Sequence, residues 1–327
     1  MTDSVIKEAL KNWIPYRLDK HEGDPQCRWL FLGNETITEP FFADTIAKCK
    51  KLSHNSQLRR CISNTAVLQE WAVLNEAIQP TTIIFHVSRC GSTLVSQLLG
   101  LNPENIVLSE VPFFDELIRL GYREKKDISS LLKAAISFYS NRRNETQKRV
   151  YIKTDSWHIH FYQMFRELYP DTPFVFLYRN PVEVLRSQQK NRGMHAVPGV
   201  VEPEIFGFEI ESMLKFSLDE YLARVLEGYF QKIIDIVTSD SKTIAIEYKR
   251  DAVKMMQQIA AFTGTVLSDN EIEIMQQRSG FHGKYPEQLF AEPTNEEPAP
   301  DFMRETVRLY EILRLKEQTQ FKHLPTS

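Results

Sequence analysis

The stretch FHVSRCGSTLVSQLL, residues 85–99, places an arginine, a glycine and several hydroxyl side chains at the end of an apolar strand. Backbone N–H groups of residues 88–93 would point together at the start of the following helix, which is a common way to bind phosphate. Arg89 would add a fixed positive charge and a planar fork of donors. The residues of this candidate site are Ser88, Arg89, Cys90, Gly91, Ser92 and Thr93. The segment therefore predicts an anion-binding loop.

This loop lacks the lysine of the nucleoside triphosphate motif G-x-x-x-x-G-K-[ST]. If Gly91 is the second glycine of that motif, His86 stands at the first glycine and Ser92 at the lysine. The loop therefore suits a phosphate that needs no magnesium bridge better than it suits a triphosphate. A phosphatase role for Cys90 is disfavoured, because that chemistry needs an arginine six residues later and Ser96 stands there.

A second candidate anion site follows the strand-like stretch PFVFLY, where the sequence continues RNPVEVLRS. Asn180 is a good N-cap and Pro181 suits the first helical position, so Arg179 would lie where a strand meets a helix N-terminus. Glu183 completes a capping-box pattern with Asn180. Two such junctions, each with an arginine, are expected for a ligand that carries phosphate at both ends.

Short apolar strands that alternate with helical segments would position these residues. Strands are expected at 82–87, 106–108, 149–154, 173–178 and 242–248. The alternation predicts an α/β fold with three layers, a parallel sheet flanked by helices. Residues 1–75 are expected to form an N-terminal accessory segment, and residues 76–327 the phosphate-binding domain. Residues 190–207 contain glycine and proline without a steady period, which predicts a long loop that covers the site.

The composition is that of a globular protein, with 327 residues, 42% of them hydrophobic, and a formal net charge of −3. This balance gives no general attraction to nucleic acid or to an anionic membrane, so an anion site has to be built locally. Four cysteines without a C-x-x-C pair indicate a reducing compartment. No run of 18 apolar residues and no signal-peptide pattern occurs, so we expect a cytoplasmic protein without membrane or nucleic-acid partners.

The two motifs together resemble those of sulfotransferases that use 3′-phosphoadenosine 5′-phosphosulfate (PAPS). SRCGSTL is similar to the family's phosphosulfate loop, P-R-S-G-[ST]-[ST]-L, with Ser88 in place of the proline and Cys90 in place of a serine. RNPVEVLRS is similar to the family's 3′-phosphate motif, which implies that role for Arg179 and Ser187. The resemblance covers about residues 80–290. It implies a P-loop-type fold and metal-free transfer of a sulfuryl group to a small-molecule or peptide hydroxyl acceptor.

The resemblance also implies catalytic roles at two further strand ends. Glu110 follows the loop at a range similar to that of the glutamate base in tyrosylprotein sulfotransferases, and it is our candidate general base. Lys153, in YIKTDSWH, would neutralise the leaving phosphate, and Arg89 is the third catalytic candidate. His158 and His160 are the alternative bases, because other branches of the family use histidine. The sequence shows no carboxylate that would orient these two histidines.

Later positions complete the candidate site. Tyr248 ends the last strand, where the family often has a tyrosine followed by an acid, but Lys249 departs from that pattern. Lys284 or Arg278, in RSGFHGKYP, would close over the 3′-phosphate, and His195 in the long loop would contact substrate.

Two other functions stay open. A P-loop small-molecule kinase would need magnesium and a loop lysine, and a nucleotide-binding protein without transfer activity would have the same binding motifs.

Overall fold

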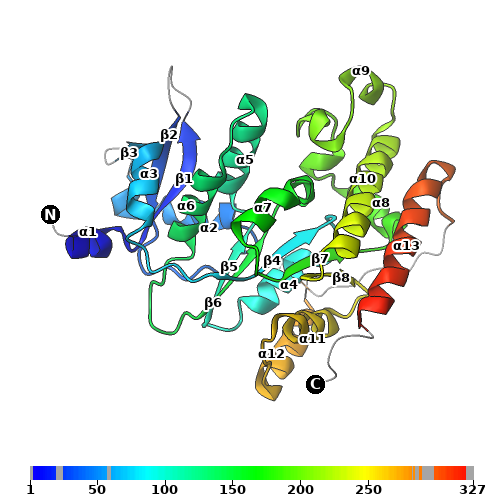
Figure 1. Cartoon of the computed structure of the whole chain (residues 1–327). Coiled ribbons are helices and arrows are strands. Elements are labelled where there is room, and N and C mark those ends of the chain that lie inside the picture. Colours follow the sequence, from blue (N-terminus) through cyan, green and yellow to red (C-terminus); the bar gives the residue numbers. More distant parts are fainter. Residues whose placement is uncertain are drawn as a thin grey trace. The chain divides into compact units, whose positions relative to one another are not determined.

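The computed structural model describes residues 3–19, 25–56, 60–281, 283, 287–288 and 298–321 (Figure 1). Its strands are β1 Trp13–Asp19, β2 Gln26–Phe31, β3 Cys61–Asn64, β4 Pro80–His86, β5 Asn105–Ser109, β6 Arg149–Lys153, β7 Phe174–Tyr178 and β8 Thr243–Glu247. Its α-helices are α1 Asp3–Leu10, α2 Phe42–Cys49, α3 Thr65–Ala72, α4 Ser92–Leu99, α5 Pro112–Glu124, α6 Ser129–Tyr139, α7 Tyr162–Leu168, α8 Pro181–Lys190, α9 Ile210–Met213, α10 Leu218–Ser239, α11 Ala252–Thr263, α12 Asp269–Ser279 and α13 Arg304–Phe321. The described residues also form five short 3-10 helices, η1 Ser53–Asn55, η3 Ser156–Phe161, η4 Met194–Ala196, η5 Pro203–Phe206 and η6 Asp301–Met303. None of these helices has both the length and the apolar character needed to span a membrane.

Five of the strands form one sheet, in the order β5-β6-β4-β7-β8. The pairs β5 with β6, β4 with β7, and β7 with β8 are all parallel. All five residues of β7 are buried, as expected for a parallel strand whose two faces are both covered. The predicted α/β fold, a parallel sheet flanked by helices, is therefore confirmed.

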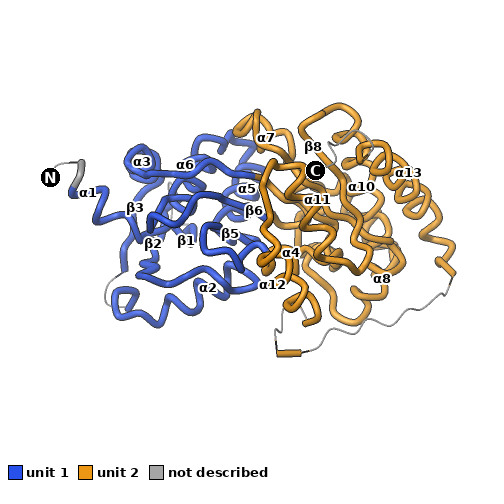
Figure 2. Tube along the Cα trace, turned by 90° about the horizontal axis from the view of Figure 1, so that it is seen from below, with its two compact units in different colours: residues 1–81, 99–153 blue, residues 82–98, 154–327 orange. Residues whose placement is uncertain are grey.

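Residue contacts divide the chain into two compact units (Figure 2). Unit 1 comprises residues 1–81 and 99–153, and unit 2 comprises residues 82–98 and 154–327. The expected division between residues 1–75 and 76–327 stays a prediction.

Unit 1 contains an antiparallel sheet of three strands, in the order β1-β2-β3. Helices α5 and α6 pack against β1, and the hydroxyl of Tyr139 donates to the carbonyl of Pro15 at 2.5 Å. The parallel pair β5–β6 belongs to the same unit. Unit 1 thus holds the two strands whose carboxyl ends carry Glu110 and Lys153.

Unit 2 contains most of β4, with β7 and β8, and helices α10, α11 and α13 pack against β8. Helix α10 begins with a complete capping box, in which Ser217 and Glu220 each bond the other's backbone N–H. Tyr178 of β7 donates its hydroxyl to Glu317 of α13 at 2.5 Å, which ties the C-terminal helix to the sheet. The carboxyl ends of three neighbouring parallel strands therefore lie at one edge of this unit, where ligands bind in open α/β sheets.

Candidate functional site

The anion loop, residues 88–93, leaves β4 through backbone conformations that few side chains adopt. Ser88 and Arg89 have φ values of 67° and 51°, and Gly91 has a φ of 75°. A left-handed residue with a Cβ costs about 1–2 kcal/mol, and such strain concentrates at ligand sites. Helix α4 follows at once, and its Val95 N–H bonds the carbonyl of Gly91 at 3.1 Å. The N-terminal N–H groups of helix α4 therefore lie at the end of this loop.

His86, the last residue of β4, fixes the first turn of this loop. Its Nδ1 accepts the N–H of Ser88 at 3.1 Å, and its Nε2 lies 2.9 Å from the carbonyl of Thr154. These partners require the neutral tautomer with the proton on Nε2. We expected the backbone N–H groups from Ser88 onward to bind the anion. That expectation is wrong for Ser88, because its N–H donates to His86. Proline could neither donate this N–H nor adopt a φ of 67°.

Cys90 and Gly91 are held by close packing. Cys90 is fully buried, and its Sγ donates to the carbonyl of Leu177 at 3.4 Å. A thiol in this setting fills space in the fold and is a poor nucleophile. A Cβ added to Gly91 would lie 2.7 Å from the ring of Tyr248. Tyr248 thus lies against the anion loop, although Lys249 follows it.

Gly91→Ala is expected to lower the free energy of unfolding by about 1–3 kcal/mol more than a left-handed alanine elsewhere does, because its Cβ overlaps the Tyr248 ring. Gly264→Ala is the matched control, since Gly264 has a φ of +68° and its added Cβ meets nothing within 4 Å. Urea unfolding of both variants measures the difference. Equal losses in the two variants would show that the Tyr248 ring yields to the new methyl group.

Arg179, the first residue after β7, joins the anion loop within unit 2. Its Nη1 donates to the carbonyl of Arg89 at 3.2 Å, and its guanidinium lies 5.1 Å from the ring centre of Tyr248. Its Nε donates to Glu183 at 2.8 Å. Ser187 follows Glu183 by four residues, so the two occupy the same face of α8. The structure therefore brings Arg89, Arg179 and Tyr248 together.

Arg250 is a basic residue of this region that the sequence analysis missed. Its Nη2 donates to Oε1 of Glu183 at 2.7 Å, while Oε2 of the same carboxylate accepts from Arg179. Burial raises the pKa of the Glu183 carboxyl, but the two arginines lower it further, and the result lies below the usual value. The expected capping box is wrong, because Glu183 pairs with these arginines and Asn180 alone caps α8.

Glu110 and Lys153 form an ion pair at the carboxyl ends of β5 and β6, within unit 1. The Lys153 Nζ lies 2.5 Å from Oε1 of Glu110, and the Glu110 N–H donates to the carbonyl of Lys153 at 2.8 Å. The lysine side chain is only 1% exposed, and the glutamate side chain is 24% exposed. The ring of Phe41 faces the ammonium at 5.2 Å. Glu110 has a φ of 50°, so it shares the left-handed conformation of Ser88 and Arg89.

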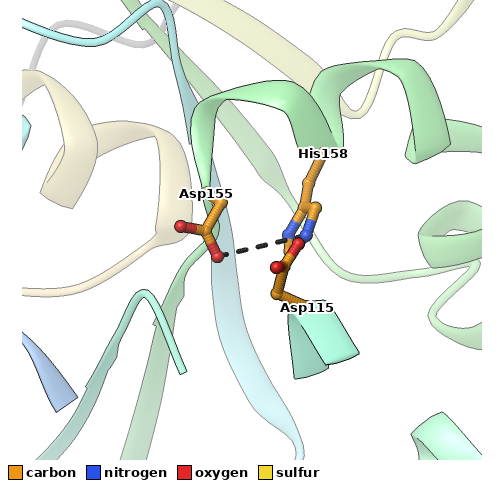
Figure 3. A group of neighbouring side chains, drawn as sticks. All are labelled: Asp115, Asp155 and His158. Atoms are coloured by element: carbon orange, nitrogen blue, oxygen red, sulfur yellow. Dashed lines mark ion pairs between the residues drawn. The ribbon is translucent and has the colours of Figure 1, made fainter. Parts of the chain in front are cut away.

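The alternative bases, His158 and His160, lie in η3 of unit 2. His158 is buried, and its Nε2 lies 4.0 Å from Oδ2 of Asp155 (Figure 3). The expectation that no carboxylate accompanies this histidine is therefore wrong. His160 packs against the rings of Phe206 and Tyr229. Burial lowers its pKa to about 4, which leaves it neutral and weakly basic at pH 7.

Gly283, in the late glycine-containing segment, lies against the start of α4. A Cβ on Gly283 would lie 3.1 Å from the backbone nitrogen of Leu94. Arg278 donates to the carbonyls of Phe281 and Gly283 at 3.3 and 3.4 Å, and burial lowers the pKa of this guanidinium. Arg278, expected to close over the 3′-phosphate, thus bonds the backbone of its own segment. Lys284, the other candidate, lies outside the described residues.

No family model matches this chain, and no curated protein matches its sequence. Among solved structures it is similar to a sulfotransferase from Alicyclobacillus acidocaldarius, with 15% identity over 76% of this chain and 97% of the other and a TM-score of 0.42. It is similar to sulfotransferase STF9 from Mycobacterium avium, with 12% identity, coverage of 80% and 81%, and a TM-score of 0.46. It is also similar to mouse sulfotransferase SULT7A1 complexed with PAP, with 14% identity, coverage of 89% and 84%, and a TM-score of 0.38.

Proposed function

We propose that this protein is a sulfotransferase that moves a sulfuryl group from PAPS to a hydroxyl acceptor. The observation that carries the proposal is the junction of the left-handed anion loop with Arg179, whose Nη1 bonds the carbonyl of Arg89 at 3.2 Å. This junction joins two basic strand ends in one unit. A nucleotide with one anionic group at its 5′ end and another at its 3′ end suits that arrangement.

The anion loop would hold the 5′-phosphosulfate through the N-terminal N–H groups of α4 and the guanidinium of Arg89. Arg179 and Ser187 would hold the 3′-phosphate, and Arg250 adds a second guanidinium beside them. The Glu183 carboxylate bridges Arg179 and Arg250, so these cations already hold one anion. A phosphate dianion offers them more charge and more acceptor oxygens than this carboxylate does.

The transfer step would form a bond between the acceptor oxygen and sulfur and break the bond from sulfur to the bridging oxygen. Glu110 would take the acceptor proton, and Lys153 would neutralise the charge that develops on the leaving 3′-phosphoadenosine 5′-phosphate. The two side chains already form an ion pair, so the proposed base and the proposed cation stand together at neighbouring strand ends.

An assay of donor turnover tests this proposal. The protein is incubated with PAPS and EDTA, with and without a panel of phenols, alcohols and tyrosine peptides, and release of 3′-phosphoadenosine 5′-phosphate is followed. We expect release that depends on an acceptor and needs no divalent metal. Magnesium-dependent phosphorylation of the same panel by ATP, with PAPS left intact, would assign the protein to the kinases.

Arg179→Ala is expected to weaken binding of adenosine 3′,5′-bisphosphate by about 10- to 100-fold, because a charge-assisted bond to the 3′-phosphate is lost. Affinity for 5′-AMP should fall much less, since that ligand lacks the 3′ group. Calorimetric titration of both ligands into both proteins gives the comparison. Equal losses for the two ligands would mean that Arg179 acts only through its bond to the Arg89 carbonyl.

A further inference from the structure

Gln188 of α8 is a fully buried amide that lies between two segments of unit 2. Its Oε1 accepts the N–H of Gly193 at 2.7 Å. Its Nε2 lies 3.2 Å from the hydroxyl oxygen of Ser88 and 3.2 Å from Nε2 of His195. One side chain therefore contacts both the anion loop and the turn that begins the 190–207 segment.

The chemistry of these partners determines the orientation of the Gln188 amide and the tautomer of the His195 ring. The N–H of Gly193 can only donate, so the oxygen of the Gln188 amide must face it and the NH₂ group must face the other two partners. Both amide hydrogens are then used, one on Ser88 and one on His195. His195 must accept at Nε2, which requires the neutral ring with its proton on Nδ1. The ring of Tyr229 lies 6.1 Å from this imidazole.

A second connection joins the same two segments. The Nη2 of Arg89 donates to the carbonyl of Asn191, the residue after α8. The left-handed pair Ser88–Arg89 is thus bonded at both residues to the segment 188–195. Ser88 stands where the resembled motif has proline, and proline carries no hydroxyl for Gln188 to bond. The link is therefore a feature of this chain's own loop.

We propose that Gln188 is a positioning residue that couples the shape of the anion loop to the turn at residues 193–195. It holds Ser88 in its left-handed conformation from one side and the His195 ring from the other. Anion binding at the loop then stabilises the turn at the start of the 190–207 segment, and a disturbed turn weakens anion binding. The effect on ligand rests on the proposed function, whereas the hydrogen-bond assignment stands without it.

The assignment is tested without any nucleotide by nitrogen NMR of the histidine rings near neutral pH. In the parent protein His195 should have its proton on Nδ1. Gln188→Glu removes the amide donors and places a carboxylate oxygen against Nε2, so His195 should become the doubly protonated cation, with its pKa raised by at least one unit. A packing role for Gln188 would not move this signal. A proton on Nε2 of His195 in the parent protein, or an unchanged ring in the variant, would overturn the inference.

The coupling is tested by calorimetric titration with adenosine 3′,5′-bisphosphate. Gln188→Leu should weaken binding about tenfold, although the ligand-binding residues proposed above are all retained. Gln189→Leu is the matched control, because Gln189 is the exposed neighbour and bonds only Asp219 among the contacts described for it. Its affinity should equal that of the parent. Parent-like affinity in Gln188→Leu would refute the coupling, whereas a parent protein that does not bind the nucleotide would refute the proposed function and leave the NMR result standing.

Discussion

Glu110→Gln is expected to lower turnover by about 10² to 10⁴ while affinity for adenosine 3′,5′-bisphosphate is retained, as for loss of a general base. The amide keeps the shape of the side chain and still accepts a hydrogen bond from the Lys153 ammonium. It cannot take the proton of the acceptor hydroxyl. Initial-rate measurements with PAPS, together with calorimetric titration of the bisphosphate, separate the loss of chemistry from a loss of binding.

The opposite end of the same strand pair supplies the control for this prediction. Glu104 precedes β5 and pairs with Lys148, which precedes β6. Glu104→Gln therefore removes a carboxylate from a lysine pair in the same unit, and parent activity is expected. If Glu110→Gln transfers sulfate at the parent rate and His158→Ala abolishes activity, His158 is the base.

Lys153→Met is expected to lower turnover by about 10² to 10³, the usual loss when one group that stabilises transition-state charge is removed. Methionine has a similar length and fills the buried space beside Phe41. The ammonium matters most while the bridging bond breaks, so turnover should fall by a larger factor than affinity for the nucleotide does. The same rate and titration measurements give both factors.

Lys148→Met is the matched control, because Lys148 is exposed and belongs to the pair at the other end of β5 and β6. Parent activity is expected for it. Equal factors for turnover and affinity in Lys153→Met would make Lys153 a ground-state binding residue. If Lys153→Met keeps the parent turnover, the ion pair of Lys153 with Glu110 has only a structural role.

The parallel sheet could be predicted from the sequence because its strands are continuous apolar runs with clear ends. Each of the five expected strands lies within two residues of its observed limits. The run CRWLFLG, residues 27–33, is strand-like, but it indicates only one strand of the antiparallel sheet of unit 1. Strand β1 contains Pro15 and its pairing shifts between Pro15 and Arg17. Proline and an irregular register both weaken the alternating pattern that identifies a strand.

The motifs predicted which strand ends carry the candidate site, but the contacts made there depend on distant residues. Arg250 meets Glu183 across 67 positions of the chain, and no local pattern reports such a pair. The left-handed conformations of Ser88, Arg89 and Glu110 could not be predicted from the sequence either, because residues with a Cβ disfavour them. The pairing of Asp155 with His158 had a local signal, since residues three apart align in a 3-10 helix.

Titration of adenosine 3′,5′-bisphosphate in EDTA, beside ATP with magnesium, decides between a sulfotransferase and a kinase. We expect the bisphosphate to bind without metal. At 100-fold excess over its Kd it should stabilise the protein by about 2.7 kcal/mol, which a melting curve detects. The bisphosphate should also bind more tightly than ATP with magnesium, because the loop has Ser92 where a triphosphate site has lysine. Absence of binding and of any melting shift with the bisphosphate, together with clear binding of ATP and magnesium, would overturn the proposed sulfotransferase function and indicate a kinase.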